Sequence, residues 1–369
     1  MRKLITLSIL LFSCLNVFPQ NNYPWNRPLK MAWSNNGITF DTPVIFQDSS
    51  GVPSLIKWKG DTLVCVFQWF RQPMNSITWD RVAVKFSYNA GITWTQPTPI
   101  IVKGIPNNYQ RPFDPTLAVI SNSSLRIYFS SSNGMPVGGL TSIVDTYSAI
   151  SSDGINYNFE PDARVDDAIR PVIDPAVIYY KGLWHYAAPS GAPQDGAFHY
   201  TSNNGINFIQ QAKFTSDNTH NWTGNIMLNI ANELRFYGSG QKIWYNSSSD
   251  GFAWQGYINT TLIGGDPSVV KAGNTKYLAV YVGEPYSVGI KKNAISEGQK
   301  QVYPNPFTHK INVIQDSGNE FYELNNSMGH AIWTGKQIEQ QDFSGLSTGL
   351  YFLKVKNKTS YQMIKLIKR

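Results

Sequence analysis

A short turn motif recurs five times along the chain. Each copy has Ser, then Asn or Asp before Gly, then an apolar residue and an aromatic one. The copies are SNNGITF (34–40), SYNAGITW (87–94), SSDGINY (151–157), SNNGINF (202–208) and SSDGFAW (248–254). Asn and Asp hydrogen-bond their own backbone in tight turns, and Gly accepts a positive φ. Five hairpins about 45 to 65 residues apart predict a repeat whose unit is one propeller blade.

A second series of short apolar segments alternates with these turns. They are VPSLIKW (52–58), FDPTLAV (113–119), IDPAVIY (173–179), GNIMLNI (224–230) and GDPSVVK (265–271). Each is followed by a short turn and a second apolar run, a pattern that is typical of antiparallel β structure. Each unit is therefore predicted to contain an inner strand, a second strand, a third strand, the Asx-Gly hairpin and an outer strand.

The order of the two series predicts how the repeat closes. The first hairpin precedes every inner segment, and the last inner segment has no hairpin after it. We expect residues 30–45 to supply the outer strand of the last blade, which leaves no open sheet edge. The predicted fold is all-β, with a five-bladed β-propeller over residues 21–290. With 42% hydrophobic, 14% aromatic and 15% charged residues, the composition excludes a disordered chain.

The N-terminus has the pattern of a secretory signal. In residues 1–20, Arg2 and Lys3 precede about ten apolar residues, too few to span a membrane. A lipoprotein signal with Cys14 as the acylated residue is the alternative. If signal cleavage removes Cys14, Cys65 is the only cysteine of the mature chain, and its apolar run predicts a small buried hydrophobe without a disulfide partner. No later run predicts a membrane span.

The formal charge of +7 does not predict a nucleic-acid partner. Residues 1–20 contribute +2 and residues 302–369 contribute +3, which leaves +2 on residues 21–301. A nucleic-acid-binding domain needs a basic stripe of its own. We expect a monomer.

The sequence changes character after the propeller. Residues 291–301, KKNAISEGQKQ, are polar and predict a linker. Residues 302–369 contain VYPNPFTHKINV (302–313), YELNNSMGHAIWTGK (322–336) and GLSTGLYFLKV (345–355), which predict a small sandwich of short strands. They closely resemble the type A sorting domain of the type IX secretion system of Bacteroidetes-type bacteria. The resemblance implies contact with that secretion machinery and delivery to the cell surface or the medium.

The first residues of the inner strands are the main candidates for a site. They are expected to face a central funnel shared by all blades, where the motifs place Val52, Asp114, Asp174, Asn225 and Asp266. Carboxylates that converge on one opening raise one another's pKa values, which can place an acid beside a base. Glycoside hydrolysis requires that pairing.

The Asp-Pro strands and Asx-Gly hairpins resemble five-bladed glycosidases of the arabinanase and xylosidase type, and more loosely the sialidase superfamily with its Asp-box hairpins. The resemblance implies that Asp114 and Asp174 act as a general base or tune the pKa of the acid, with Asp266 beside them. Val52 stands where such enzymes have their base. The acid would come from elsewhere, and the candidates are Glu284, Asp195 and Glu233.

Further residues are candidates for substrate binding. Guanidinium groups suit carboxylates, so Arg71, Arg111 and Arg170 could form a clamp. Trp69 is a candidate for stacking on a sugar, and His185 for polar contact. The alternatives are that these aromatics fill the space between blades, that His185 is packed, and that the axial aspartates only satisfy entry turns. No cofactor is expected, although a Ca²⁺ ion on the axial aspartates is an alternative.

Two functions are therefore compared. In one, the exported protein hydrolyses glycosidic bonds of an extracellular glycan, with Asp114 and Asp174 in the funnel. In the other, it is a propeller without catalysis that binds a glycan or a protein at the cell surface.

Overall fold

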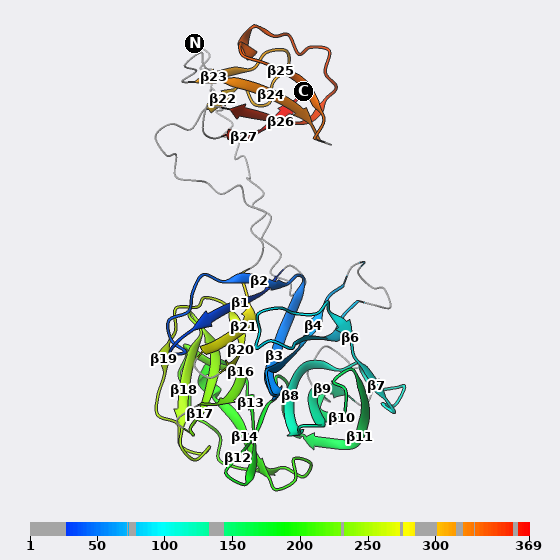
Figure 1. Cartoon of the computed structure of the whole chain (residues 1–369), viewed down its shortest axis with the longest axis vertical. Coiled ribbons are helices and arrows are strands. Elements are labelled where there is room, and N and C mark those ends of the chain that lie inside the picture. The colour runs from blue at the N-terminus through cyan, green and yellow to red at the C-terminus, as the bar shows by residue number, and fades with distance from the viewer. Residues whose placement is uncertain are drawn as a thin grey trace, which may run out of the picture. The chain divides into compact units, whose positions relative to one another are not determined.

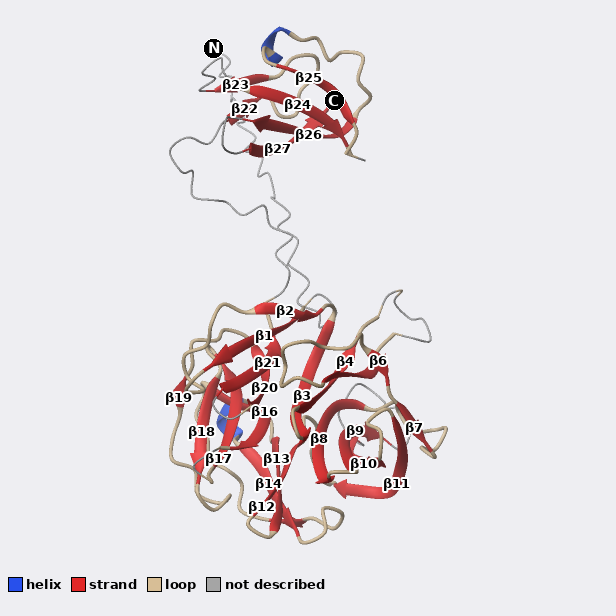
Figure 2. Ribbon diagram, viewed as in Figure 1, coloured by secondary structure: helices blue, strands red, loops and turns tan. Residues whose placement is uncertain are grey.

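A computed structural model describes most of the chain after residue 26 (Figures 1 and 2). The described residues are 27–71, 73, 79–132, 144–229, 232–273, 276–284, 301–314, 320–327, 329–356 and 361–369. They fall into two compact units, Met1–Tyr286 and Ser287–Arg369. The predicted signal peptide, with Cys14, and residues 291–300 of the predicted linker lie outside the described residues.

The described part of the chain is nearly all β structure. Its only helical segments are two single turns of 3₁₀ helix, η2 (Pro193–Asp195) and η3 (Ile338–Gln340). The alternating apolar segments and Gly-containing turns account for this, because they favour short paired strands over longer helices.

Five sheets make up the described part of the first unit, numbered here by the chain order of their inner strands. Sheet 1 is β3 (Ser50–Lys59), β4 (Thr62–Trp69), β5 (Arg81–Ser87) and β6 (Thr98–Pro99). Sheet 2 is β8 (Phe113–Ser121), β9 (Ser124–Ser132), β10 (Val144–Ser151), β11 (Asn156–Val165) and β7 (Ile101–Lys103). Sheet 3 is β12 (Ala176–Tyr180), β13 (Leu183–Pro189), β14 (Ala197–Ser202) and β15 (Ile209–Gln210). Sheet 4 is β16 (His220–Leu228), β17 (Leu234–Gly240), β18 (Trp244–Ser248) and β19 (Ile258–Asn259). Sheet 5 is β20 (Gly265–Ala272), β21 (Lys276–Val282), β1 (Leu29–Ser34) and β2 (Val44–Gln47).

The inner strands of the five sheets contact one another in a circuit. Strand β3 contacts β8, β8 contacts β12, β12 contacts β16, β16 contacts β20, and β20 contacts β3. None of these sheets is closed on itself. The starts of the five inner strands are therefore brought to one place, although they are far apart in the sequence.

Sheet 5 joins the two ends of the first unit. Strand β1 pairs with β21 in antiparallel register, from Leu29 opposite Val282 to Ser34 opposite Tyr277. Strand β2 then pairs with β1 at the outer edge. The sequence predicted one outer strand from residues 30–45, whereas the structure has two strands, β1 in third position and β2 outermost.

The hydrophobic core is divided among the interfaces between neighbouring sheets. One cluster joins Val64 of sheet 1 to Ile127 of sheet 2, and four more join sheets 2 and 3, 3 and 4, 4 and 5, and 5 and 1. Cys65 lies in the cluster between sheets 5 and 1, fully buried, and this burial raises the pKa of its thiol. Cys65 is thus packed as a hydrophobic residue.

The recurring turn motif has the same serine-to-glycine hydrogen bond in each copy. In the copy at residues 151–157, the Ser151 hydroxyl accepts from the amide of Gly154, and the Asp153 carboxylate accepts from the amides of Ile155 and Asn156. Ser34, Ser202 and Ser248 accept from their turn glycines in the same way, and Ser87 does so across one extra residue. The sequence pattern therefore specifies one local structure.

The turn glycines also lie against the preceding sheet. The site of a Cβ on Gly154 is 3.1 Å from the Phe86 ring of sheet 1, and that on Gly205 is 2.9 Å from the Tyr128 hydroxyl of sheet 2. The turns with Gly251, Gly37 and Gly91 meet sheets 3, 4 and 5 in the same manner. Glycine is thus required for two reasons: its backbone has a positive φ, and the neighbouring side chain approaches it closely.

The second unit has two small sheets around its own core. Strands β22 (Gln301–Tyr303) and β23 (Asn312–Ile314) form one sheet. The other sheet has the order β25 (Ala331–Gly335), β24 (Phe321–Asn326), β26 (Gly349–Lys356) and β27 (Tyr361–Lys368). In β26, Tyr351, Leu353 and Val355 are buried, while Lys354 and Lys356 on the opposite face are only partly buried. This is the alternation that LYFLKVK predicts.

Replacing Gly251 with Ala is expected to destabilise the protein more than replacing Gly182. Both glycines have similar φ values, +84° and +88°. A Cβ at Gly251 would lie 2.3 Å from the buried His185 ring, whereas one at Gly182 meets nothing within 4 Å. Gly182→Ala should cost about 1 kcal/mol for the left-handed backbone, and Gly251→Ala about 1–3 kcal/mol more for the overlap. Urea unfolding followed by fluorescence measures the difference, and equal losses would refute the packing role of the turn.

Candidate functional site

A shared backbone distortion starts the inner strands of sheets 1, 2 and 5. In each strand, two residues lie opposite one residue of the neighbouring strand: Val52-Pro53, Asp114-Pro115 and Asp266-Pro267. The first residue of each pair has a positive φ, between +44° and +48°, and Asp174 before Pro175 has +54°. Asp tolerates this conformation, and Pro is tolerated because a bulge does not need its missing N–H. The Asp-Pro dipeptide therefore fits this bend.

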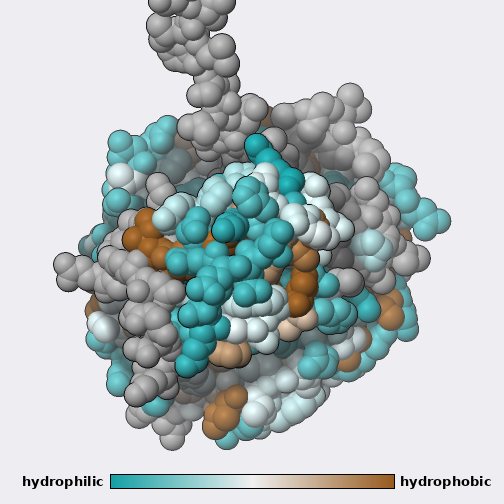
Figure 3. Space-filling model, turned by 90° about the horizontal axis from the view of Figure 1, so that it is seen from above, coloured by the Kyte–Doolittle hydropathy of each residue, from teal (hydrophilic) through white to brown (hydrophobic). Residues whose placement is uncertain are grey.

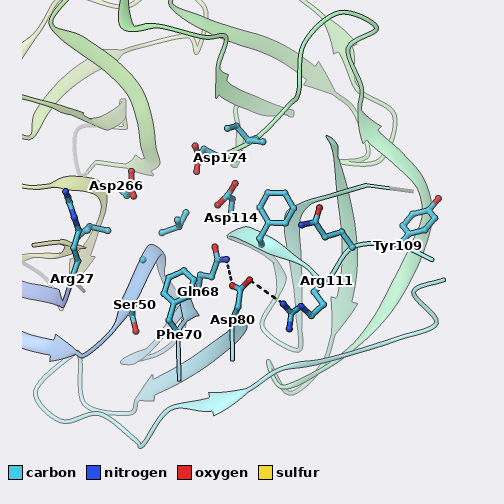
Figure 4. Close-up of a pocket in the computed structure, with 16 residues that line it drawn as sticks. Arg27, Ser50, Gln68, Phe70, Asp80, Tyr109, Arg111, Asp114, Asp174 and Asp266 are labelled. Carbon is cyan, nitrogen blue, oxygen red and sulfur yellow. Dashed lines mark hydrogen bonds and ion pairs between the residues drawn. The ribbon is translucent and has the colours of Figure 1, made fainter. Parts of the chain in front are cut away.

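The bends bring three aspartates into one pocket. Asp114, Asp174 and Asp266 line a pocket of about 690 Å³ at the start of the inner strands (Figure 4). They come from sheets 2, 3 and 5, and each is partly buried. The convergence that the motif alignment predicted for these three residues is present in the structure.

The environment favours the protonated forms of these carboxyl groups. Burial raises the pKa of Asp114 to about 7, with the negative charge of Asp266 adding to the shift and the backbone amide of Asp174 opposing it. Burial raises the pKa of Asp266 to about 6, against the positive charge of Arg27. Burial, then the charges of Asp114 and Asp266, raise the pKa of Asp174 well above its usual range. The group therefore retains protons near neutral pH.

The motif alignment placed Asn225 level with the three aspartates. In the structure it lies at a different level. Its side-chain amide donates to Ser54 and Thr116, at 3.1 and 3.3 Å. These two residues stand two positions after Val52 and Asp114, so Asn225 belongs one level deeper and Thr223 takes the outer position. Strand β16 has its register shift between Asn221 and Gly224 and has Gly where the others have Pro, which moves the motif along the chain.

A fourth carboxylate in the pocket has no motif in the sequence. Asp80 precedes β5, and its Oδ1 accepts a hydrogen bond from the Gln68 side-chain amide. Its Oδ2 lies 3.5 Å from the Arg111 guanidinium, which also donates to the carbonyl of Trp79 at 3.1 Å. Arg111 is thus the only one of the three predicted arginines that lines the pocket, where it pairs with a protein carboxylate. Gln68 and Asp80 were not predicted because they flank a loop without a repeated pattern.

Apolar side chains form part of the pocket wall, beside polar residues such as Arg27, Ser50 and Gln110. Phe70, Phe113, Ile173 and Val282 line it together with Val52. Phe70 is braced by the Trp79 ring, with 5.5 Å between ring centroids. A pocket with an apolar wall and a few polar groups is typical of a small-molecule site.

The other predicted site residues lie outside this pocket. Arg170 donates to the Ser190 carbonyl and lies 3.8 Å from Asp195, so these two form a separate pair. Glu284 and Arg71 are exposed, and Arg71 lies over the ring of Trp69 at 5.3 Å. Glu233, a further candidate for the acid, instead accepts from Arg235 at 3.1 Å.

The remaining aromatic candidates, Trp69 and His185, pack between sheets and do not line the pocket. Trp69 packs against the core cluster between sheets 5 and 1. His185 is buried and stacks on His199, and burial lowers the pKa of both rings. Neither residue reaches the pocket, because both fill space between sheets.

Within the described ranges, no group of three or more His, Cys, Asp or Glu side chains is arranged to hold a metal ion, and the calcium alternative stays a prediction. Over the same ranges, no helix has the length and apolarity to cross a bilayer. Hydrophobic residues on the face shown in Figure 3 form separate patches among hydrophilic ones.

Comparison with protein families identifies the second unit. Residues 301–369 match the family described as the secretion system C-terminal sorting domain. These residues form a type IX secretion sorting domain. The sorting domain implies interaction with the secretion machinery, and the protein is exported to the cell surface or the medium. No curated protein matches the chain.

Several solved structures are similar to the chain at low identity. Zg3597, a family 117 glycoside hydrolase of Zobellia galactanivorans, is 13% identical over 60% of this chain and 73% of its own, with a TM-score of 0.48. A glycosyl hydrolase from Bacteroides ovatus is 10% identical over 72% and 92%, with a TM-score of 0.45. A protein of unknown function from Dyadobacter fermentans is 13% identical over 86% and 94%, with a TM-score of 0.45. Similarity at this level assigns no activity to this chain.

Replacing Asp114 with Asn is expected to stabilise the protein at pH 8 and to leave it unchanged at pH 4. A folded-state pKa of about 7 lies above the ordinary value for Asp, so the folded state loses stability as the pH rises from about 4 to about 7. The neutral Asn avoids that loss, which we expect to be up to about 4 kcal/mol at pH 8, since one pKa unit corresponds to about 1.4 kcal/mol. Urea unfolding at both pH values measures it, with Asp61→Asn, on an exposed turn, as the control. A variant less stable than the parent at pH 8 would contradict the raised pKa.

A chain that ends at residue 300 is expected to remain in the periplasm, on the inner side of the outer membrane. It lacks the matched sorting domain, which directs passage across that membrane. Cell fractionation with an antibody against the first unit gives the distribution, and an exported reporter fused to residues 301–369 is the positive control. Surface or medium levels equal to those of the full chain would show that another segment directs export.

Proposed function

We propose that the protein is an exported, carbohydrate-directed propeller that hydrolyses glycosidic bonds of extracellular glycans. The observation that supports this most is the convergence of Asp114, Asp174 and Asp266 in one pocket, with pKa values raised toward neutrality. Such a group can supply a general acid, because a carboxyl group with a raised pKa still carries its proton close to neutral pH.

The proposed fold is a closed five-bladed propeller, with the five sheets as blades. Three observations support it: the circuit of contacts among the inner strands, one core cluster between each neighbouring pair of sheets, and the pairing of β1 with β21. The pairing would join the N-terminal strands to the last blade and close the ring without a free edge between its ends.

Glycosidic hydrolysis fits the chemical composition of the pocket. The reaction needs one carboxylic acid to protonate the leaving oxygen and one carboxylate on the other side of the sugar. Asp114, with a pKa of about 7, is the proposed acid, because burial and then the negative charge of Asp266 favour its protonated form. The apolar wall with Phe70 and Phe113 would face the C–H groups of a sugar ring. Glu284 is not retained as the acid because it is exposed and outside the pocket.

A binding protein without catalysis is the second candidate. It is favoured by Val52, which has the same positive φ as the axial aspartates but no carboxyl group. A β-branched residue is rarely found in that conformation. In this alternative, the aspartates and arginines would bind a glycan by hydrogen bonds, and no bond would be broken.

A hydrolysis screen separates the two candidates. The protein is incubated with a panel of aryl glycosides and polysaccharides, with and without Ca²⁺, and released reducing sugar is measured. We expect hydrolysis of at least one substrate, and a loss of about 10²-fold or more in kcat for Asp114→Asn or Asp174→Asn. Asp61→Asn should keep the parental rate. No hydrolysis by the folded protein across the panel, with glycan binding retained, would favour the binding protein.

A further inference from the structure

Asp80 differs from the other carboxylates of the pocket in how it is held. It lies at the start of sheet 1's third strand rather than on an inner strand, and it has a positive φ of +53°. Non-glycine residues in this conformation are uncommon and are concentrated at functional sites. Two side chains fix its carboxylate, the amide of Gln68 on one oxygen and the guanidinium of Arg111 on the other.

Asp80 lies among charged groups of both signs. Arg111 forms the ion pair at 3.5 Å. Burial and then the charge of Arg111 lower the pKa of Arg81, and the negative charge of Asp80 opposes that shift. Asp114 is a negative neighbour, whose pKa is raised by burial and Asp266 and, to a smaller extent, by Asp80. The pocket thus contains one carboxylate held by an ion pair and a hydrogen bond, and a separate group of three from sheets 2, 3 and 5 whose pKa values are raised.

Asp80 is also accessible from the pocket. Its side chain is 31% exposed, and Figure 4 shows its carboxylate among the residues that line the cavity, with the hydrogen bond to Gln68 and the ion pair to Arg111 drawn. The same sheet contributes Val52 at the axial position, where no proton can be accepted. Sheet 1 therefore has its carboxylate on a different strand from sheets 2, 3 and 5.

We propose that Asp80 is the general base of the site, held in place by Gln68 and Arg111. This inference rests on the proposed glycoside hydrolysis. In the step, a water molecule attacks the anomeric carbon and gives one proton to the Asp80 carboxylate. The bond between that carbon and the leaving oxygen breaks, and the oxygen takes the proton of Asp114. Asp80 then loses its proton to solvent and Asp114 regains one, so the net reaction consumes one water and forms two hydroxyl groups.

A purely structural role is the alternative for Asp80. In that role, its ion pair with Arg111 would only connect the start of β5 to the segment before β8. Removing it would then change stability or substrate affinity, but the pH dependence of the rate would keep its shape. A general base gives a different signature, because its ionisation sets the acidic limb of the pH profile.

The test compares Asp80→Asn, Asp80→Glu and the control Asp61→Asn in the full chain, on the best substrate of the hydrolysis screen. Asn keeps one of the two oxygens, which can accept from Gln68 or from Arg111, and it has nearly the same shape, so folding is expected to survive, and the unfolding midpoint checks this. We expect Asp80→Asn to lower kcat by about 10²-fold or more, with KM changed less than about threefold. The acidic limb of kcat/KM should disappear, and the alkaline limb should move to lower pH because Asp114 loses a negative neighbour. Asp80→Glu should recover part of the rate.

The outcomes are distinguishable. If the parent hydrolyses a substrate, two results for Asp80→Asn would overturn the role of Asp80: a rate within about threefold of the parent, or an intact acidic limb. The glycosidase proposal would stand in either case. If Asp80→Asn does not fold, the folded Asp80→Glu variant decides. Part of the parental rate with a displaced acidic limb supports the role, whereas an acidic limb at its parental position opposes it. Absence of any hydrolysis by the parent would refute both proposals.

Discussion

The bend at the start of the inner strands is the constraint on which the site depends. An ordinary strand would point successive side chains to opposite faces of its sheet, and none would point toward the pocket at the start of the inner strands. The two-residue bulge, with its first residue at a positive φ, turns that residue toward the pocket instead. Asp before Pro suits this geometry, because Asp tolerates the left-handed backbone and Pro needs no ladder hydrogen bond.

Holding three carboxyl groups in one pocket costs stability, and the rest of the first unit must offset that cost. Asp114, Asp174 and Asp266 are each partly removed from water, and they repel one another when ionised. The five core clusters between sheets and the five turns that dock on neighbouring sheets provide the rigid frame. A destabilised site on a rigid frame is the arrangement expected where function and stability conflict.

The repeated parts of the structure could be predicted from the sequence, and the unrepeated parts could not. Four copies of Ser-x-Asx-Gly and one with an extra residue specified five similar turns, and Asp-Pro specified which residues meet in the pocket. Asn225 was misplaced because Gly-Asn in β16 replaces the Asp-Pro that sets the alignment. Asp80 and Gln68 were missed because their proximity depends on how a loop of sheet 1 packs against Arg111, which no local pattern encodes. Arg170 and Asp195 were expected in the pocket but pair with each other elsewhere.

The most direct test of this account is the titration of the axial carboxyl groups. Aspartate labelled with ¹³C at the carboxyl carbon allows each group to be followed by NMR, with Asp114→Asn, Asp174→Asn and Asp266→Asn used for assignment. The account predicts that the Asp114 and Asp266 signals titrate near pH 7 and pH 6, and that removing either charge lowers the titration midpoint of Asp174. Titration of all three groups below about pH 4.5, close to the ordinary value for Asp, would contradict it.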